Sequence, residues 1–291
     1  MKSALHKSPI EDSKIFVAKE LADKHFDPIW HSHSEYQLFV TTKGTGTRFI
    51  GDSIKSFGNN ELVLTGSNLP HLWRSDEQYF NKESSLKVSG IVVYMQENLL
   101  GDHLMDKEEM VLLKKLFKKS ARGLEFYGET KQQVIKMLKE LTQLSGLDSL
   151  IHLLNILNLL AHTKEYHYIS TTEYANPFKE DETARMNKVY EYALKNYRKK
   201  IHLNELAELL HMTPTSFSRY FSVTHNKGFS KFITELRVKH ACKLLTETEL
   251  SVAAIADRTG FKTLSNFNKH FRDEMKKKPT DYKKEFLQIL S

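Results

Sequence analysis

Residues 201–286 contain one pattern twice, and this near-repeat constrains the fold more than any other feature of the chain. Each copy has an apolar/polar lead-in around a small residue, then a tight turn, then a row of the form Phe-x-basic-x-Phe. The two rows are Phe217, Arg219, Phe221 and Phe267, Lys269, Phe271. Phenylalanines four positions apart lie on one face of a helix, so the basic residue between them points elsewhere.

Each copy predicts two helices joined by a tight turn, with the second helix able to enter a DNA major groove. Thr213 and Thr263 suit the N-cap positions of these second helices, which should cover residues 214–224 and 264–275. Residues 230–246 predict one long helix that joins the two modules and fixes their separation.

The outward faces of the two second helices are the candidate DNA-contacting surfaces. Their residues are Thr215, Ser216, Ser218 and Arg219 in the first module, and Leu264, Ser265, Asn268 and Lys269 in the second. Arg219 is the best candidate for base readout, because its fork matches O6 and N7 of guanine. Lys269 is a point charge, so we expect the second module to depend more on phosphate contacts and on Asn268.

Basic residues are concentrated in the same part of the chain. Residues 184–291 hold 21 Lys or Arg against 11 Asp or Glu, and the rest of the chain holds 22 against 25. A basic module attached to a slightly acidic one is typical of a protein that binds a polyanion. The alternative is a solvated, lysine-rich surface.

Composition excludes a disulfide-stabilised or membrane-spanning chain. There is one cysteine, Cys242, whose helical context predicts a packed residue. No apolar run approaches the ~20 residues of a membrane span, and the N-terminal residues lack the apolar stretch of a signal peptide. We therefore expect a soluble, cytoplasmic protein with no membrane partner.

Residues 1–100 predict a small β domain. Short strand-like runs cover residues 15–19, 35–42, 47–51, 61–65 and 86–95, with Gly- and Asn-containing turns between them. Such spacing suggests a sandwich or jelly-roll barrel with a pocket at its mouth.

A polar cluster marks this β domain. His31-x-His33 precedes a strand, a Gly-rich turn follows, then GNNELVL, then Pro70-His71, and this order resembles a cupin barrel. In metal-binding cupins three His and one Glu hold a divalent ion, and the resemblance would assign His31, His33 and His71. Gln37 stands near the expected acidic ligand and is a poor transition-metal ligand, so we predict no metal or other cofactor.

The interpretation we favour is a polar rim that binds a small-molecule effector. Its residues are Trp30, His31, His33, Glu35, His71 and Trp73. The alternatives are a metal site, or histidines that bind no ligand in a constitutive protein.

Residues 101–163 predict a helical coupling region, followed by a linker over 164–183. The helix expected over residues 147–162 is apolar on two faces. One face can pack on the barrel or a neighbouring helix, and the other is a candidate homodimer seam; simple burial of both faces is the alternative.

Residues 184–291 resemble the AraC-type transcription regulators. The matching marks are IHLNELAELLHMTPTSFSRYF, LR-x3-A-x2-LL at residues 236–245, IADRTGF and FNKHFRDEMKKKPTDYKK. The resemblance implies two tandem helix-turn-helix modules, a sensory domain, dimers, RNA polymerase as a partner, and a sugar or similar polar effector. The family often has Gly after each recognition helix, where this chain has Asn226 and Lys276. Asn tolerates a left-handed backbone, whereas Lys does not readily adopt it.

We therefore predict an α+β multidomain protein: a cupin-like barrel with following helices, then an all-α domain of two helix-turn-helix modules joined by a long helix. The predicted function is that of a non-enzymatic, effector-controlled, sequence-specific regulator of transcription, and the resemblance favours an activator. The rivals are a metal-dependent cupin enzyme with a DNA-binding tail, and a non-specific DNA binder.

Overall fold

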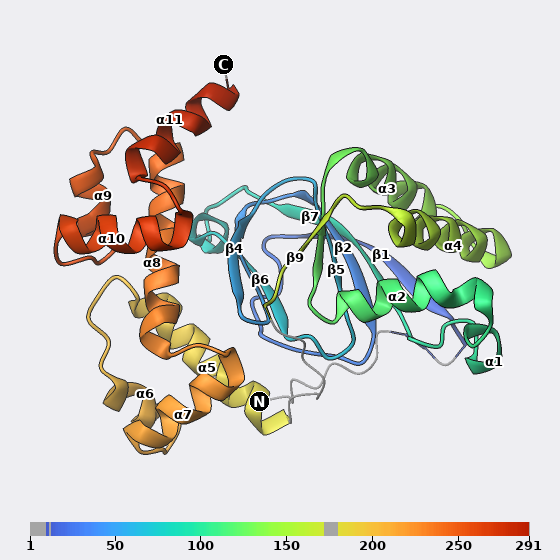
Figure 1. Cartoon of the computed structure of the whole chain (residues 1–291), viewed down its shortest axis with the longest axis horizontal. Coiled ribbons are helices and arrows are strands. Elements are labelled where there is room, and N and C mark those ends of the chain that lie inside the picture. The colour runs from blue at the N-terminus through green and yellow to red at the C-terminus, as the bar shows by residue number, and fades with distance from the viewer. Residues whose placement is uncertain (1–9, 12, 172–179, 291) are drawn as a thin grey trace. The chain divides into compact units, whose positions relative to one another are not determined.

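The computed structural model describes residues 10–11, 13–171 and 180–290. The chain divides into two compact units, Met1–Thr183 and Ala184–Ser291 (Figure 1). The division falls where the sequence changes from slightly acidic to strongly basic.

The strands of the N-terminal unit form two antiparallel sheets. The larger sheet has the order β1 (Phe16–Asp23), β7 (Val88–Met95), β2 (Tyr36–Lys43), β5 (Glu61–Thr65), β8 (Leu124–Phe126) and β9 (Tyr166–Tyr168). The smaller sheet has the order β4 (Ser53–Phe57), β3 (Gly46–Ile50) and β6 (His71–Ser75). Among the described residues no strand pairing joins the two sheets, so the expected cupin-like barrel is an open, two-sheet arrangement.

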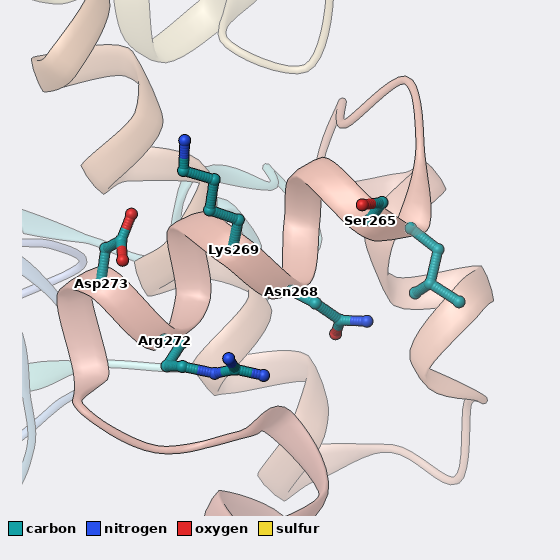
Figure 2. A pocket seen from close by; sticks show the side chains of 6 residues that line it. Ser265, Asn268, Lys269, Arg272 and Asp273 are labelled. Carbon is teal, nitrogen blue, oxygen red and sulfur yellow. The ribbon is translucent and has the colours of Figure 1, made fainter.

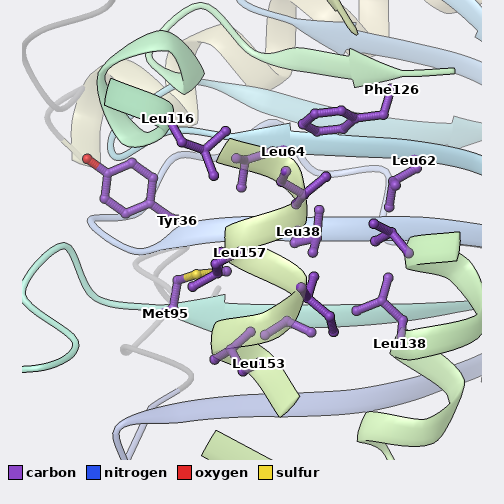
Figure 3. Packing of buried hydrophobic residues seen from close by; sticks show 14 of the residues in the cluster. Tyr36, Leu38, Leu62, Leu64, Met95, Leu116, Phe126, Leu138, Leu153 and Leu157 are labelled. Carbon is purple, nitrogen blue, oxygen red and sulfur yellow. The ribbon is translucent and has the colours of Figure 1, made fainter. Parts of the chain in front are cut away.

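The six-stranded sheet is buried on both faces because both sets of alternating side chains are apolar. In β2, Leu38 and Val40 belong to one buried cluster and Phe39 to another. The first cluster packs against α2 (Val111–Ser120), α3 (Gly128–Leu141) and α4 (Gly146–His162), as Figure 3 shows. The second cluster includes Ile50 and Trp73 of the smaller sheet. The remaining short elements are η1 (Glu77–Phe80), α1 (Asp102–Met105) and η2 (Glu108–Met110).

Within residues 1–100 the strands β4 and β6 were not predicted, and two further strands lie beyond that range, in segments where the sequence predicts none. β8 interrupts the expected helical region 101–163, and β9 lies in the expected linker 164–183. Each strand is three residues long, too short to show an alternating pattern, and each is defined by its pairing: β5 with β8, and β8 with β9. The helical region and the start of the expected linker therefore belong to the same compact unit as the strands.

The C-terminal unit is all helical. Its helices are α5 (Glu180–Asn196), α6 (Leu203–Leu209), α7 (Pro214–His225), α8 (Phe229–Glu247), α9 (Val252–Arg258), α10 (Leu264–Met275) and α11 (Pro279–Leu290). α8 is the long joining helix predicted from the sequence, and α6–α7 and α9–α10 lie toward its opposite ends (Figure 1). We call α6–α7 and α9–α10 the first and second modules, and α7 and α10 the recognition helices.

The two modules repeat with a constant register after the turn. Their N-caps are Thr213 and Thr263, and the following helices α8 and α11 begin at residues 229 and 279, again 50 positions apart. Before the turn the spacing is 49, because α6 and α9 begin at residues 203 and 252. The second turn is thus one residue longer than the first.

Within the described ranges, none of the helices is both long and apolar enough to cross a lipid bilayer.

Candidate nucleic-acid interface and effector site

Both recognition helices begin at a threonine that caps them. The backbone amide of Ser216 donates to Thr213 Oγ1 at 3.2 Å, and that of Asn266 donates to Thr263 Oγ1 at 3.2 Å. Such a cap satisfies one of the amides that have no partner inside the helix and contributes about 1 kcal/mol. Pro214 occupies the first helical position of α7, where proline is favoured.

The inner faces of the recognition helices are fixed by aromatic packing. The four phenylalanines of the repeated rows, at positions 217, 221, 267 and 271, have no exposed surface. Thr215, Ser216, Ser218 and Arg219 are consequently exposed on α7, as predicted. The Ser216 hydroxyl also accepts a hydrogen bond from Thr213 Oγ1 at 2.9 Å, so it is partly committed to the cap.

The outward face of α10 carries a recess of about 540 Å³, shown in Figure 2. Its lining contains the four predicted residues, Leu264, Ser265, Asn268 and Lys269, together with Arg272 and Asp273. Arg272 and Asp273 were not predicted from the sequence. The signal was present, since Arg272 follows Asn268, and Asp273 follows Lys269, by the four positions that place residues on one helix face.

The basic groups on the two recognition helices are available to an anion. Arg219, Lys269 and Arg272 form no ion pair or side-chain hydrogen bond with another residue in the described part of the chain. Their charge therefore faces solvent uncompensated, which suits phosphate or guanine contacts.

Both recognition helices end in a left-handed residue. Asn226 has φ 52° and ψ 21°, and Lys276 has φ 58° and ψ 16°. The expectation that Lys276 would not adopt this conformation readily is wrong for the structure. The Lys276 ammonium donates to the backbone carbonyl of Asp273 at 2.7 Å, which satisfies one terminal carbonyl of the helix.

In the N-terminal unit, His31 and His33 of one segment meet His71 of another. His31 and His71 exchange backbone hydrogen bonds of 3.2 and 2.9 Å, and their ring centroids are 4.5 Å apart. The ring of His33 lies 5.1 Å from that of His71. One ligand atom from each histidine lies within 4.8 Å of the other two. We call these residues the histidine cluster.

Backbone carbonyls orient all three rings, and Nδ1 of His33 lies 3.0 Å from the carbonyl oxygen of Glu35. Nδ1 of His31 and Nδ1 of His71 each lie 2.7 Å from a carbonyl oxygen, of Ile29 and Leu69 respectively. Since Nδ1 must donate there, Nε2 carries the lone pair. Nε2 of His33 lies 3.3 Å from Gln37 Oε1.

The possible metal ligands of the histidine cluster are three imidazole rings, and no carboxylate is among them. Glu35 is 3% exposed, and its carboxylate lies 3.4 Å from Nδ1 of His33, the nitrogen opposite the one that meets Gln37. Three imidazoles fit a zinc-like ion that keeps an open position. Ligand nitrogens around one such ion are about 3.4 Å apart, so the cluster would have to contract.

The two tryptophans are buried and do not lie on the exposed rim that was predicted. Trp30 is 1% exposed and Trp73 is 5% exposed, and Trp73 packs edge-on against Phe39 with centroids 4.9 Å apart. His71 and Trp73 share one face of β6 because they are two positions apart. The tryptophans therefore form part of the interior next to the histidine cluster, and not the exposed stacking surface that the sequence suggested.

The comparisons with known proteins concern the C-terminal part of the chain. The helix-turn-helix domain family matches residues 206–285. An HTH-type transcriptional regulator of Haemophilus influenzae is 32% identical over 83 residues, 28% of each chain. The Msm operon regulatory protein of Streptococcus mutans is 26% identical over 102 residues, 35% of this chain and 37% of its own. The DNA-binding domain of AdpA, solved in complex with a target DNA, is 26% identical and covers 34% of this chain and 88% of its own, with a TM-score of 0.32.

The C-terminal unit carries an AraC-type helix-turn-helix domain. The matched residues include both recognition helices and the joining helix α8. The chain spans only 28% and 37% of the lengths of the two regulators named above. These matches therefore say nothing about the role of the N-terminal unit.

The unit that precedes the AraC-type domain also contains a buried ionic network that the sequence analysis missed. Arg48, 1% exposed, donates to Glu61 at 3.0 Å and to Glu125 at 2.5 Å, and Lys55 also pairs with Glu125 at 2.5 Å. Burial raises the pKa of Glu61. Burial also acts to raise the pKa of Glu125, but the charges of Arg48 and Lys55 outweigh it and hold that pKa below its usual value. No sequence signal links these residues, because Glu125 lies on the unpredicted strand β8.

Proposed function

We propose that the chain is a sequence-specific regulator of transcription that binds double-stranded DNA through α7 and α10. The observation that carries the proposal is the repeated recognition helix, capped at its start, packed through two phenylalanines, and bearing uncompensated basic groups outward. Helices presented in this way suit two adjacent segments of the major groove.

Five of the outward residues have assigned roles in this proposal. Arg219 reads a guanine with its fork, and Asn268 reads an adenine through N6 and N7. Lys269 and Arg272 neutralise phosphates. Leu264, 44% exposed at the start of α10, contacts a thymine methyl group.

Selection of bound sequences from random duplex DNA tests the proposal. We expect a motif of two parts about one helical turn apart, roughly 10 base pairs, one part for each recognition helix. Enrichment of no motif, together with equal affinity for unrelated duplexes, would reject sequence-specific regulation in favour of non-specific binding.

The proposed effector site is the histidine cluster with Glu35 and the neighbouring tryptophans, in a protein with no catalytic role. A short chain of contacts supports coupling to the second unit. The backbone amide of Gly51 donates to the carbonyl of Pro70, next to His71, at 2.8 Å. Asp52 then accepts from Ser170 Oγ at 2.7 Å and from the amide of Thr171 at 2.9 Å, just before the segment that leads to α5. An effector that shifts His71 would thereby shift Thr171.

A thermal-shift screen with sugars and small organic acids tests the effector site. A bound compound should raise the unfolding midpoint of the wild-type chain and not that of His71→Ala. The variant Asp52→Asn should keep the thermal shift but lose any effect of the compound on DNA affinity. An equal shift in His71→Ala would place the compound elsewhere.

A homodimer through α4 is part of the same proposal. Leu153 and Ile156 of α4 are fully buried, whereas Leu147 is 70% exposed and Ile151 is 48% exposed. The exposed pair continues the apolar stripe predicted as a seam. Substitution of Leu147 and Ile151 by Glu should shift the sedimentation of the chain from dimer to monomer; an unchanged dimer would move the seam away from α4.

A second candidate function is a metal-responsive regulator, or a metal-dependent enzyme, at the histidine cluster. The ligand atoms within 4.8 Å of one another favour it. Metal analysis of the purified chain decides between the candidates. Stoichiometric zinc, iron or manganese that is lost in His31→Ala and His71→Ala would support the metal site, and its absence in wild type would leave the organic effector.

A further inference from the structure

One cavity of the N-terminal unit shares no lining residue with the histidine cluster. It has a volume of about 640 Å³, within the range of small-molecule sites. Four parts of the chain line it: the first residue of β2, the segment just after β7, helix α1 and helix α2. Its position therefore places it on the helix-covered side of the six-stranded sheet.

The floor of this cavity is apolar, aromatic and preformed. Tyr36 and Phe117 stack with ring centroids 4.2 Å apart and an angle of 23° between their planes. Both rings and Met105 also belong to the main buried cluster, where they are 5%, 3% and 6% exposed. Side chains held in a packed core need no reordering on binding, so this floor suits a flat apolar or aromatic group.

The walls carry charges of both signs. The segment after β7 and α1 contribute Glu97 and Asp102, and α2 contributes Lys118. None of these three forms an ion pair with another described residue. The other two charges cancel, because Lys114 donates to Asp106 at 2.9 Å.

The carboxylate of Glu97 is close to the aromatic floor. Burial raises the pKa of the Tyr36 hydroxyl, and the nearby Glu97 carboxylate raises it further. A cation that contacts Glu97 would therefore sit at the edge of the ring pair. This arrangement places a carboxylate, an aromatic surface and an ammonium group around one small cavity.

We propose that this cavity binds a small zwitterion of the amino-acid type with an aromatic or bulky apolar side chain. The ammonium group of the ligand contacts Glu97 and Asp102, its carboxylate contacts Lys118, and its side chain packs on Tyr36 and Phe117. The chemistry follows from the two uncompensated acids, the single uncompensated lysine and the apolar floor. The proposal is independent of DNA binding.

Calorimetric titration of the full chain with three matched probes tests it. The probes are L-phenylalanine, phenethylamine and phenylacetate, which carry both charges, only the cation and only the anion. We expect phenylalanine to bind most tightly and phenylacetate most weakly. Glu97→Gln should weaken phenylalanine and phenethylamine by about tenfold, as for loss of a charge-assisted contact. Lys118→Met should weaken phenylalanine alone.

Control variants separate the site from general charge effects. Glu109→Gln and Lys115→Met change exposed charges of η2 and α2 that do not line the cavity, and should leave all three affinities within about twofold, the range of a weak surface interaction. The proposal is overturned if none of the probes binds, if phenylacetate binds best, or if the controls change affinity as much as the cavity variants. DNA affinity without a probe should be unchanged in every variant.

Discussion

The two helix-turn-helix modules share a register but differ in what surrounds it. Lys227 and Glu235 form an ion pair just after the first module, and Lys277 and Glu285 form its counterpart 50 positions later, just after the second. The side chains of the first pair are 9% and 8% exposed, whereas those of the second are 36% and 54% exposed. The same pairing is therefore a buried interaction after the first module and a surface interaction after the second.

This difference shows that a sequence repeat fixes the spacing of the paired residues but not the free energy that the pair contributes. The charge of a buried pair is removed from water, so each partner depends on the other. The exposed pair remains solvated and contributes little. Similar differences are expected on the DNA-facing surfaces, where Arg219 corresponds to Lys269.

The largest expected effect is on stability, from removing one lysine of the buried pair. Lys227→Met should destabilise the chain by about 3–5 kcal/mol, because it leaves Glu235 buried and unpaired. Lys277→Met should cost at most about 1 kcal/mol. Urea unfolding of both variants at pH 7 measures the difference, and equal losses would show that burial does not distinguish the pairs.

The pH dependence of the first variant sharpens this test. Burial raises the pKa of Glu235, and the charge of Lys227 partly offsets that rise. An acid whose pKa is raised on folding opposes folding in its ionised form, so stability is highest at low pH and falls as pH rises through the folded-state pKa. The penalty of Lys227→Met should therefore shrink on acidification, whereas the small effect of Lys277→Met should not follow this trend.

The next effect concerns DNA recognition. Arg219→Ala should cost about 1–3 kcal/mol on the selected site and relax preference at one base pair. Lys269→Ala should weaken all sequences alike and reduce the slope of log affinity against log salt by about one. Titrations of both variants on matched and mismatched duplexes at several salt concentrations would separate the roles. If Lys269→Ala loses as much base preference as Arg219→Ala, the proposed difference between base readout by Arg219 and phosphate contact by Lys269 is wrong.

A smaller effect is expected at the turns inside the modules. His211 and Gly260 both have positive φ, 56° and 87°. A Cβ at Gly260 would meet the backbone oxygen of Arg198 at 2.4 Å. Gly260→Ala should destabilise the chain by at least about 1–2 kcal/mol. His211→Gly should be neutral or stabilising, and a large loss in His211→Gly would mean that the His211 side chain contributes to packing of the first module.

The smallest effect is expected at the ends of the recognition helices. Lys276→Gly should stabilise the chain by roughly 1 kcal/mol, because glycine adopts the left-handed backbone without strain. Asn226→Gly should change stability less, since Asn already tolerates that conformation. Thermal unfolding of the two variants would compare them, and a destabilised Lys276→Gly would show that the contact of the Lys276 ammonium with Asp273 outweighs the strain.

The C-terminal fold was largely predictable because its signals are local. N-caps, Phe-x-basic-x-Phe rows and helical periodicity act within a few residues, and α8 lies within one residue of its predicted ends at 230 and 246. Residues 61–65 were also predicted correctly as a strand. Strands β4, β6, β8 and β9 were not predicted. For β8 and β9 the reason is that a three-residue strand depends on its partner and not on its own pattern.

The candidate sites also divide into residues that local spacing predicts and residues that only tertiary contacts bring together. The outward residues of α7 and α10 followed from helical spacing, and Arg272 could have been added by the same rule. The histidine cluster was anticipated only through resemblance, since His33 and His71 are far apart in sequence. The depth of Trp30 and Trp73, and the contacts of Arg48 with Glu61 and Glu125, depend on how two sheets face each other.

The sequence by itself determined the paired modules, their caps, the one-residue difference between their turns and the concentration of basic residues beside them. These features arise from interactions between residues close in the chain. Only the tertiary structure decided which of two equivalent ion pairs is buried, where the three histidines meet, and that Lys276 takes a left-handed backbone. Those outcomes depend on burial and on contacts between distant segments, which local periodicity does not encode.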